Sequence, residues 1–471
     1  MKKNKFIKNL SFAIFAQIIS LLSSFCVQFF APKVLSVEEY AYWQLFLFYV
    51  SYINISRIGI IDGIYLKLGG KSREELDCSL LKTKWMIFSI LQIIIALIMS
   101  VIANNVIIDP NRKIVLLACG ICMVLINVNN FFGFLFQAIN ETNIYSISEI
   151  IYNLLWFIAV GIICFLRVGS YKLIICMYVL GQVCAFFYLA YKARFIFSSR
   201  ITGFKQTIID MLDDAKCGLP LLVSMYASML VTGSARLVVD KRWGIEAFGY
   251  FSFSMSLTTF LLKFISQVSM VLFPAIRRVE KNTQKVIFEN FNIVLAILLP
   301  AALIFFSPMK FIVTKWLPQY ETSMRYLGIL IPICVFDGKM QLLYSTYLKV
   351  LRKEKKLLYI NGLSVLISFG LSVIGAYIFQ NLEFIAWGLL LAIMVRSFVA
   401  EISLLSLLKI KTNILVTFSE IFIMIVFAYL STVLISKDIL LIYSVMYIGY
   451  LFLNHKSIAL LVKKMKHTKG K

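Results

Sequence analysis

A small set of basic side chains lies inside long apolar stretches of this sequence, where charged side chains are rare. The set consists of Arg57, Arg236, Lys263, Lys339 and Arg396. A charge near the middle of a bilayer costs roughly 2.5 kcal/mol or more, so it is expected to have either a partner or a function. Arginine can hold two phosphate oxygens at once. If these side chains face one water-filled cavity, they predict a site for a phosphate-bearing substrate.

Acidic residues in the same stretches allow two interpretations. Asp62, Asp240 and Asp337 are candidates for binding a coupling proton or sodium ion. Each cation could equally be neutralised by an acid on a neighbouring helix, which would make the charges structural. Asp240 follows Arg236 by four residues and shares its helix face, so this pair could form, whereas Asp337 and Lys339 are two residues apart and do not face each other.

Apolar blocks of 17 to 27 residues must position these side chains. Hydrophobic residues make up 61% of the 471 positions and charged residues 15%, against about 25% charged residues in a soluble domain. About 20 apolar residues cross the hydrocarbon core as a helix, whereas barrel strands appear as alternating segments of about ten. We therefore expect an all-α integral membrane protein with about 14 transmembrane helices, at 10–31, 41–66, 85–104, 114–138, 149–166, 173–191, 217–239, 249–275, 288–308, 325–348, 358–379, 385–407, 414–435 and 439–455.

The distribution of lysine and arginine predicts the orientation in the membrane. With the N-terminus inside, the inner segments carry 31 of these residues and the outer loops 10. This bias is the positive-inside pattern, so both termini are expected in the cytoplasm of a bacterial inner-membrane protein. The net charge of +24 is explained by these loop positions, and no nucleic-acid partner is expected. The basic, apolar N-terminus lacks a convincing cleavage site and is expected to be an uncleaved first span.

An internal repeat predicts two similar halves. Residues 36–43 (SVEEYAYW) and 244–251 (GIEAFGYF) match at an offset of 208, and both follow the first span of a six-span block. An offset of six helices keeps the orientation, so the repeat is parallel, which is a common transporter plan. The expected domains are an N-terminal six-helix lobe (1–216), a C-terminal six-helix lobe (217–413), and two further helices with a basic tail (414–471). The cationic cavity is expected between the lobes.

Other sequence features argue against an enzyme or a metalloprotein. There is no phosphate-binding G-x-x-x-x-G-K-[ST] loop, and the short loops leave no room for a catalytic domain. Cys119 and Cys122 form a CxxC inside an apolar helix and are expected to be structural. The two histidines lie near the C-terminus, so neither a metal nor a cofactor is expected. Asp213 and Asp214 are expected to begin a solvated helix.

The segment 31–71 carries a family resemblance. It combines a short outer loop, LSVEEYA, with a glycine-interrupted inner end, DGIYLKLGGK. Gly59, which precedes this inner end, and Gly63, Gly69 and Gly70 within it are expected to loosen the helix. This pattern resembles the Wzx-type polysaccharide flippases of the multidrug/oligosaccharidyl-lipid/polysaccharide exporter superfamily, although Ser36 and Ala41 stand where glycine is common. The resemblance implies two six-helix lobes and alternating access coupled to an ion gradient. It implies an undecaprenyl-diphosphate-linked oligosaccharide as substrate, for O-antigen or capsule synthesis, with a polymerase and a chain-length regulator as partners.

Three alternatives remain open at this point. A multidrug exporter of organic cations in the same superfamily should have an acid-lined cleft, whereas the opening hairpins here are at least as rich in cations. A membrane glycan polymerase or ligase needs a large outer loop, and the longest expected one is 309–324. The third alternative is a peptidoglycan-precursor flippase of related fold, and the pattern over 31–71 favours the polysaccharide flippases over it.

Overall fold

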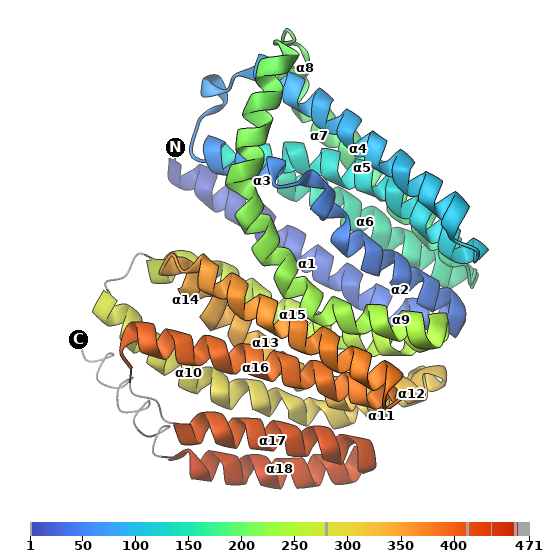
Figure 1. Cartoon of the computed structure of the whole chain (residues 1–471), viewed down its shortest axis with the longest axis vertical. Coiled ribbons are helices and arrows are strands. Elements are labelled where there is room, and N and C mark those ends of the chain that lie inside the picture. The colour runs from blue at the N-terminus through green and yellow to red at the C-terminus, as the bar shows by residue number, and fades with distance from the viewer. Residues whose placement is uncertain (1, 278–280, 411–413, 435, 456–458, 460–471) are drawn as a thin grey trace. The chain divides into compact units, whose positions relative to one another are not determined.

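The structure is a computed structural model that describes residues 2–277, 281–410, 414–434, 436–455 and 459 (Figure 1). The described residues form helices and contain no strand. The chain divides into two compact units, Met1–Tyr226 and Ala227–Lys471. The three-part division made from the sequence stays a prediction. The predicted basic tail beyond residue 459, which includes His467, lies outside the described residues.

Unit 1 is a helical bundle centred on a long, half-buried helix, α5. In this unit α1 packs on α6, α4 on α5 and α6 on α7, and α5 also contacts α2, α3 and α7. The core includes the aromatic side chains of Phe88, Phe131, Phe132 and Phe136. The elements are α1 (Lys2–Val34), α2 (Val37–Tyr52), η1 (Ile53–Arg57), α3 (Ile60–Leu68), η2 (Arg73–Glu75), α4 (Cys78–Val106), α5 (Pro110–Ala138), α6 (Thr142–Leu166), α7 (Tyr171–Lys192), α8 (Arg194–Phe197) and the first part of α9 (Phe204–Arg277).

Unit 2 is a second bundle built around the paired helices α15 and α16. Here α12 and α13 pack on α16, α12 contacts α17, and α17 lies beside α18 (Figure 1). Tyr344 and Tyr347 are fully buried in its core. Its elements after α9 are α10 (Lys281–Ala302), η3 (Leu303–Phe305), α11 (Phe306–Trp316), η4 (Pro318–Tyr320), α12 (Glu321–Leu330), α13 (Ile333–Lys339), the π-helix η5 (Met340–Tyr344), α14 (Ser345–Val350), α15 (Glu354–Tyr377), α16 (Leu382–Leu408), α17 (Ile414–Val433) and α18 (Ser436–Leu453).

The described helices confirm an all-α integral membrane protein. Ten are long and apolar enough to cross a membrane, or twelve if each of two bent pairs is one span. The segment 204–263 counts once in that number although Gly244 breaks it, and Asp438–Leu453 is apolar but shorter. Those two features would account for the remaining spans of the expected 14, and the number 14 stays a prediction.

Large apolar side chains cover the outside of the bundles, as a lipid environment requires. Leu97 on α4, Phe165 on α6 and Phe422 on α17 are 61%, 86% and 66% exposed. Polar side chains such as Gln92 and Asn127 are instead fully buried. Polar side chains are therefore found in the interior of the bundle.

The two copies of the sequence repeat break the chain at equivalent positions. Ser36 separates α1 from α2, and its hydroxyl caps α2 by accepting a hydrogen bond from the amide of Glu39 at 3.2 Å. The residue at the same place in the second copy is Gly244, which interrupts α9 with φ 82° and ψ −168°. Both breaks precede an apolar and aromatic helix, so the local structures agree with the sequence alignment of the repeat.

Candidate functional site

The second membrane span of unit 1 is broken beside two charged residues. The segments Val37–Arg57 and Ile60–Leu68 meet at an angle of 62°. The chain turns at Ile58 (φ 50°) and Gly59 (φ 77°), both in the left-handed region. Glycine adopts this conformation without a steric penalty, so Gly59 explains where the break falls. Irregular backbone of this kind occurs within a membrane only where protein or a cavity covers it.

Polar side chains from α4 and α5 cover this break. The Ser56 hydroxyl donates to Gln92 Oε1 at 2.7 Å, and Asn127 Nδ2 contacts the same oxygen at 2.8 Å. One helical turn further along α5, the Asn130 amide donates to Asn54 Oδ1 at 3.1 Å. These side-chain bonds hold Asn54 and Ser56 of the 3₁₀ segment η1 against α4 and α5, next to Arg57, the last residue of that segment.

Arg57 forms a buried ion pair with Asp62 across the break. The distance from Arg57 Nη2 to Asp62 Oδ1 is 3.0 Å, and the two residues are only 4% and 3% exposed. The guanidinium also lies over the ring of Phe134, with 5.2 Å between its central carbon and the ring centroid. The structural pairing considered from the sequence is therefore present at Arg57. The pair is electrically neutral and joins η1 to the first turn of α3.

One acid of α6 was not singled out by the sequence analysis. Glu149 lies one helical turn from Tyr145 and forms a hydrogen bond with its hydroxyl. Glu149 lies at the first position of an expected span, where a carboxylate is easily taken as a solvated helix end.

Asp214 was wrongly expected to be solvated. Its carboxylate lies 2.8 Å from Lys67 Nζ of α3 and 2.5 Å from Lys84 Nζ of α4, and its exposed fraction is 0%. The preceding residue, Asp213, is exposed as expected, since its side chain is 56% exposed and pairs with Lys216 along the helix surface. Neither residue begins the helix, because α9 starts at Phe204. The two neighbours differ because successive helical residues point about 100° apart, so only one of them faces α3.

Unit 2 also contains a broken span with buried charges. The segments Pro318–Leu330 and Ile333–Val350 meet at 46°, and the π-helix Met340–Tyr344 follows. Wide helical turns of this type are frequent at functional sites because they redirect side chains. This segment carries two of the residues singled out from the sequence, Asp337 and Lys339.

Asp337 and Lys339 face different partners, as their spacing predicts. Asp337 pairs with Arg396 of α16 and accepts a hydrogen bond from Gln341 at 2.9 Å. Lys339 pairs with Glu420 of α17, and both side chains of this pair are at most 3% exposed. Arg396 also contacts the hydroxyl of Ser228 on α9 at 3.3 Å. Both predicted cations of this region are therefore held by acids on other helices.

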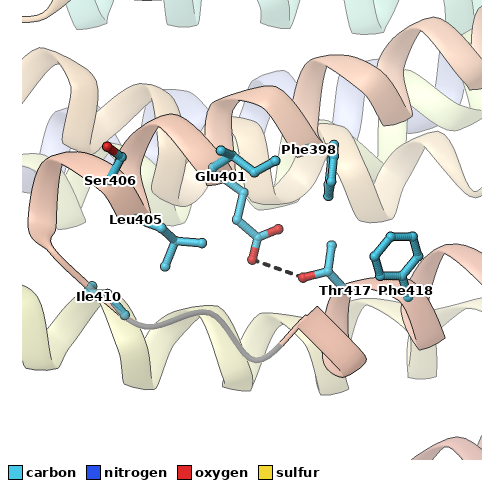
Figure 2. A pocket seen from close by; sticks show the side chains of 8 residues that line it. Phe398, Glu401, Leu405, Ser406, Ile410, Thr417 and Phe418 are labelled. Atoms are coloured by element: carbon cyan, nitrogen blue, oxygen red, sulfur yellow. Dashed lines mark hydrogen bonds between the residues drawn. The ribbon is translucent and has the colours of Figure 1, made fainter.

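A pocket of about 390 Å³ lies between α16 and the start of α17 (Figure 2). Its walls are mainly apolar, and the buried carboxylate of Glu401 is its one acidic wall residue. Glu401 Oε1 accepts hydrogen bonds from Asn292 at 2.8 Å and from Thr417 at 3.4 Å. The remaining lining residues are Phe398, Ile402, Leu405, Ser406, Ile410 and Phe418.

The other three predicted site residues all lie on α9. Arg236 donates from Nε to the hydroxyl of Ser252 at 3.2 Å, and its guanidinium lies over Phe248 at 5.2 Å. Asp240, one turn further, is 7% exposed, whereas Lys263 is exposed. The structure thus pairs Arg57 with Asp62 in unit 1 and Arg396 with Asp337 in unit 2. Their role in binding a substrate stays a prediction.

The described helices define a multi-pass, all-α membrane protein, and solved structures of membrane transporters share its fold. A structure of the lipid II flippase MurJ in an inward closed conformation is 15% identical, with a TM-score of 0.68 over 97% of this chain and 100% of MurJ. An inward-facing multidrug resistance MATE family transporter of the MOP superfamily is 14% identical, with a TM-score of 0.61 over 86% and 98% of the two chains. A MOP superfamily transporter from Pyrococcus furiosus is 14% identical, with a TM-score of 0.54 over 86% and 96%.

The chain belongs to the polysaccharide biosynthesis protein family, whose sequence model matches residues 6–280. This match confirms the family that the segment 31–71 indicates. A search of curated proteins found no match to this chain.

Proposed function

We propose that this protein is a flippase that moves undecaprenyl-diphosphate-linked oligosaccharide repeat units across the bacterial cytoplasmic membrane for surface polysaccharide synthesis, O-antigen or capsule. The observation that carries the proposal is the match to the polysaccharide biosynthesis family, on a fold that a lipid II flippase also has. The positive-inside pattern supports a cytoplasmic location for both termini. A polysaccharide polymerase and a chain-length regulator act on the product in this proposal.

The broken spans support a mechanism of alternating access. Discontinuous membrane helices form substrate and ion sites in many transporters, because their free ends and freed polar groups face a cavity. Each unit of this protein has such a break beside a buried ion pair, Arg57–Asp62 in unit 1 and Arg396–Asp337 in unit 2. The protein alternates between inward-open and outward-open states while the sugar-diphosphate head group is carried and the lipid tail stays in the bilayer.

The predicted basic residues have two different roles in this mechanism. Arg236 and Lys263 meet the diphosphate directly, since an arginine and a lysine together can bind several phosphate oxygens. Arg57, Lys339 and Arg396 exchange their acidic partners for the substrate as the helices move. A buried cation that loses its acid needs another anion nearby, because an unpaired charge in low dielectric is costly.

An ion gradient drives the cycle through the acids of the same pairs. A proton or sodium ion that neutralises Asp62 or Asp337 removes the attraction that holds the paired arginine, which then becomes available to the substrate. Asp240 is the third candidate for this coupling because it is buried one helical turn from Arg236.

Transport by purified protein in liposomes tests the proposal. An undecaprenyl-diphosphate oligosaccharide, labelled on its sugar, is placed in one leaflet, and its appearance in the other leaflet is followed with a membrane-impermeant enzyme that removes the label. We expect this lipid to change leaflets faster in liposomes that contain the protein than in protein-free liposomes. Transport of a cationic dye without any movement of the lipid would favour a multidrug exporter, and movement of lipid II alone would favour a peptidoglycan-precursor flippase.

Matched variants of α9 test the binding role of its arginine. Arg236→Gln removes a half-buried cation next to Ser252, whereas Arg242→Gln removes an exposed cation on the same helix that donates to the Ala376 carbonyl at 3.1 Å. We expect Arg236→Gln to lower the translocation rate at least about tenfold, the loss of one charge-assisted hydrogen bond. Arg242→Gln should retain transport. Equal rates for both variants would remove Arg236 from the site.

A further inference from the structure

Helix α3 and the first part of α9 meet backbone to backbone. Gly59, which immediately precedes α3, and Gly63 in its first turn lie four residues apart, and Gly218 of α9 packs against both. A Cβ atom added at Gly218 would lie 2.0 Å from the carbonyl oxygen of Gly59, and one added at Gly63 would lie 1.9 Å from that of Asp214. Small residues at this spacing allow close approach of membrane helices.

Two lysines hold one carboxylate next to this contact. Lys67 from α3 binds Asp214 Oδ1, and Lys84 from α4 binds Oδ2. One ammonium on each of two oxygens is the arrangement that a phosphate group also accepts, and the three residues carry one excess positive charge. Lys84 and Asp214 are buried, whereas the side chain of Lys67 is 44% exposed. The site is therefore open on the side of Lys67.

The short loop between α3 and α4 holds the two lysines in place. The Gly70 amide donates to the Ala138 carbonyl at 3.0 Å, which ties the end of α3 to α5. The Ser72 amide donates to Glu75 Oε2 at 2.6 Å, and this hydrogen bond lowers the pKa of Glu75 below its usual value. The lysines thus belong to a fixed frame, while their carboxylate partner comes from a different helix, α9.

We propose that Lys67 and Lys84 form a diphosphate site, which Asp214 occupies in this conformation. The inference rests on the proposed function and names the place where the substrate head group is loaded. When α9 withdraws from α3, the diphosphate replaces the Asp214 carboxylate between the two ammonium groups. A diphosphate carries more negative charge than a carboxylate, so it competes well for two lysines. The loop 67–84 carries five basic residues and is predicted to be cytoplasmic, which is the side where such lipids are made.

Binding of undecaprenyl diphosphate to the full-length protein in nanodiscs tests the site, with undecaprenol as the ligand that lacks phosphate. Asp214→Asn removes the internal competitor and should tighten diphosphate binding about tenfold, the gain expected if Asp214 fills the site in about nine molecules of ten. Asp213→Asn is the matched control. It makes the same change in charge at the neighbouring, exposed position, and it should leave the affinity unchanged.

A second pair of variants keeps the test valid if Asp214→Asn fails to fold. Lys67→Gln removes a partly exposed ligand and should weaken binding of undecaprenyl diphosphate about tenfold, as expected for one charge-assisted hydrogen bond. Lys71→Gln removes an exposed cation four residues away and should have no effect. Binding of undecaprenol should not change in any variant.

The outcomes separate this inference from the proposed function. If the wild type translocates the lipid-linked sugar but Lys67→Gln binds undecaprenyl diphosphate as tightly as Lys71→Gln, the diphosphate site is overturned and the flippase proposal stands. An equal gain in Asp214→Asn and Asp213→Asn would also overturn it, because bulk charge would then explain the effect. If the wild type prefers neither undecaprenyl diphosphate nor its glycosylated form over undecaprenol, the proposed function itself fails.

Discussion

Replacing Gly63 with alanine places a methyl group 1.9 Å from the carbonyl oxygen of Asp214. Contacts of a Cβ atom below 3.0 Å essentially never occur, so α3 and α9 must move apart by at least 1.1 Å, the difference between those two distances. The obstructing atom belongs to the backbone of a helix and cannot rotate away. Overpacking costs about 1–3 kcal/mol, and this site should lie at the upper end because the displacement also lengthens the Lys67 and Lys84 ion pairs of Asp214.

Thermal stability of the purified protein in detergent measures this cost. The fraction that remains monodisperse after graded heating is read by size-exclusion chromatography. Gly63→Ala should lower the temperature at which half of the protein is lost, and it should lower the yield. Gly161→Ala on α6 is the control, because a Cβ there meets nothing within 4 Å and helical glycine is less favourable than alanine by about 1 kcal/mol. If both variants resist heat equally, the close contact between α3 and α9 does not exist.

Three further predictions concern the buried charges. Arg57→Met should cost about 3–5 kcal/mol of stability because it leaves Asp62 buried without its partner. Adding Asp62→Leu to this variant should recover most of the loss. A single variant that resists heat as well as the wild type would contradict this. Lys339→Met should likewise be rescued by Glu420→Leu, measured by the yield of monodisperse protein. Glu401→Gln keeps an acceptor for Asn292 and should be mild, whereas Glu401→Ala should cost about 1–3 kcal/mol in the same heating assay.

The rescued variants also separate structural charges from functional ones. If the Arg57–Asp62 pair only holds α3 to η1, the folded double variant translocates lipid as fast as the wild type. If the pair exchanges partners during transport, the double variant is stable but inactive. The same comparison applies to Lys339 and Glu420, so stability and transport must be measured on the same preparations.

Hydropathy determined most of the secondary structure because each membrane helix satisfies its own backbone locally. The expected span 385–407 is the centre of α16 (Leu382–Leu408), and the expected span 85–104 lies within α4 (Cys78–Val106). The observed helices are longer at polar ends, where hydropathy falls but helical hydrogen bonding continues. The gap between the expected spans 217–239 and 249–275 contains the break at Gly244, whereas the span expected at 41–66 is broken at Ile58 and Gly59.

The partners of the charged residues were decided only by the tertiary structure. Asp213 and Asp214 are identical in type and adjacent in sequence, yet one is exposed and the other is enclosed by lysines from α3 and α4. The pairing of Lys339 with Glu420 spans 81 positions. The amount of charge placed in the membrane is a local property of the sequence. Which charges neutralise one another depends on which helix faces meet, and that is settled by side-chain packing between segments far apart in the chain.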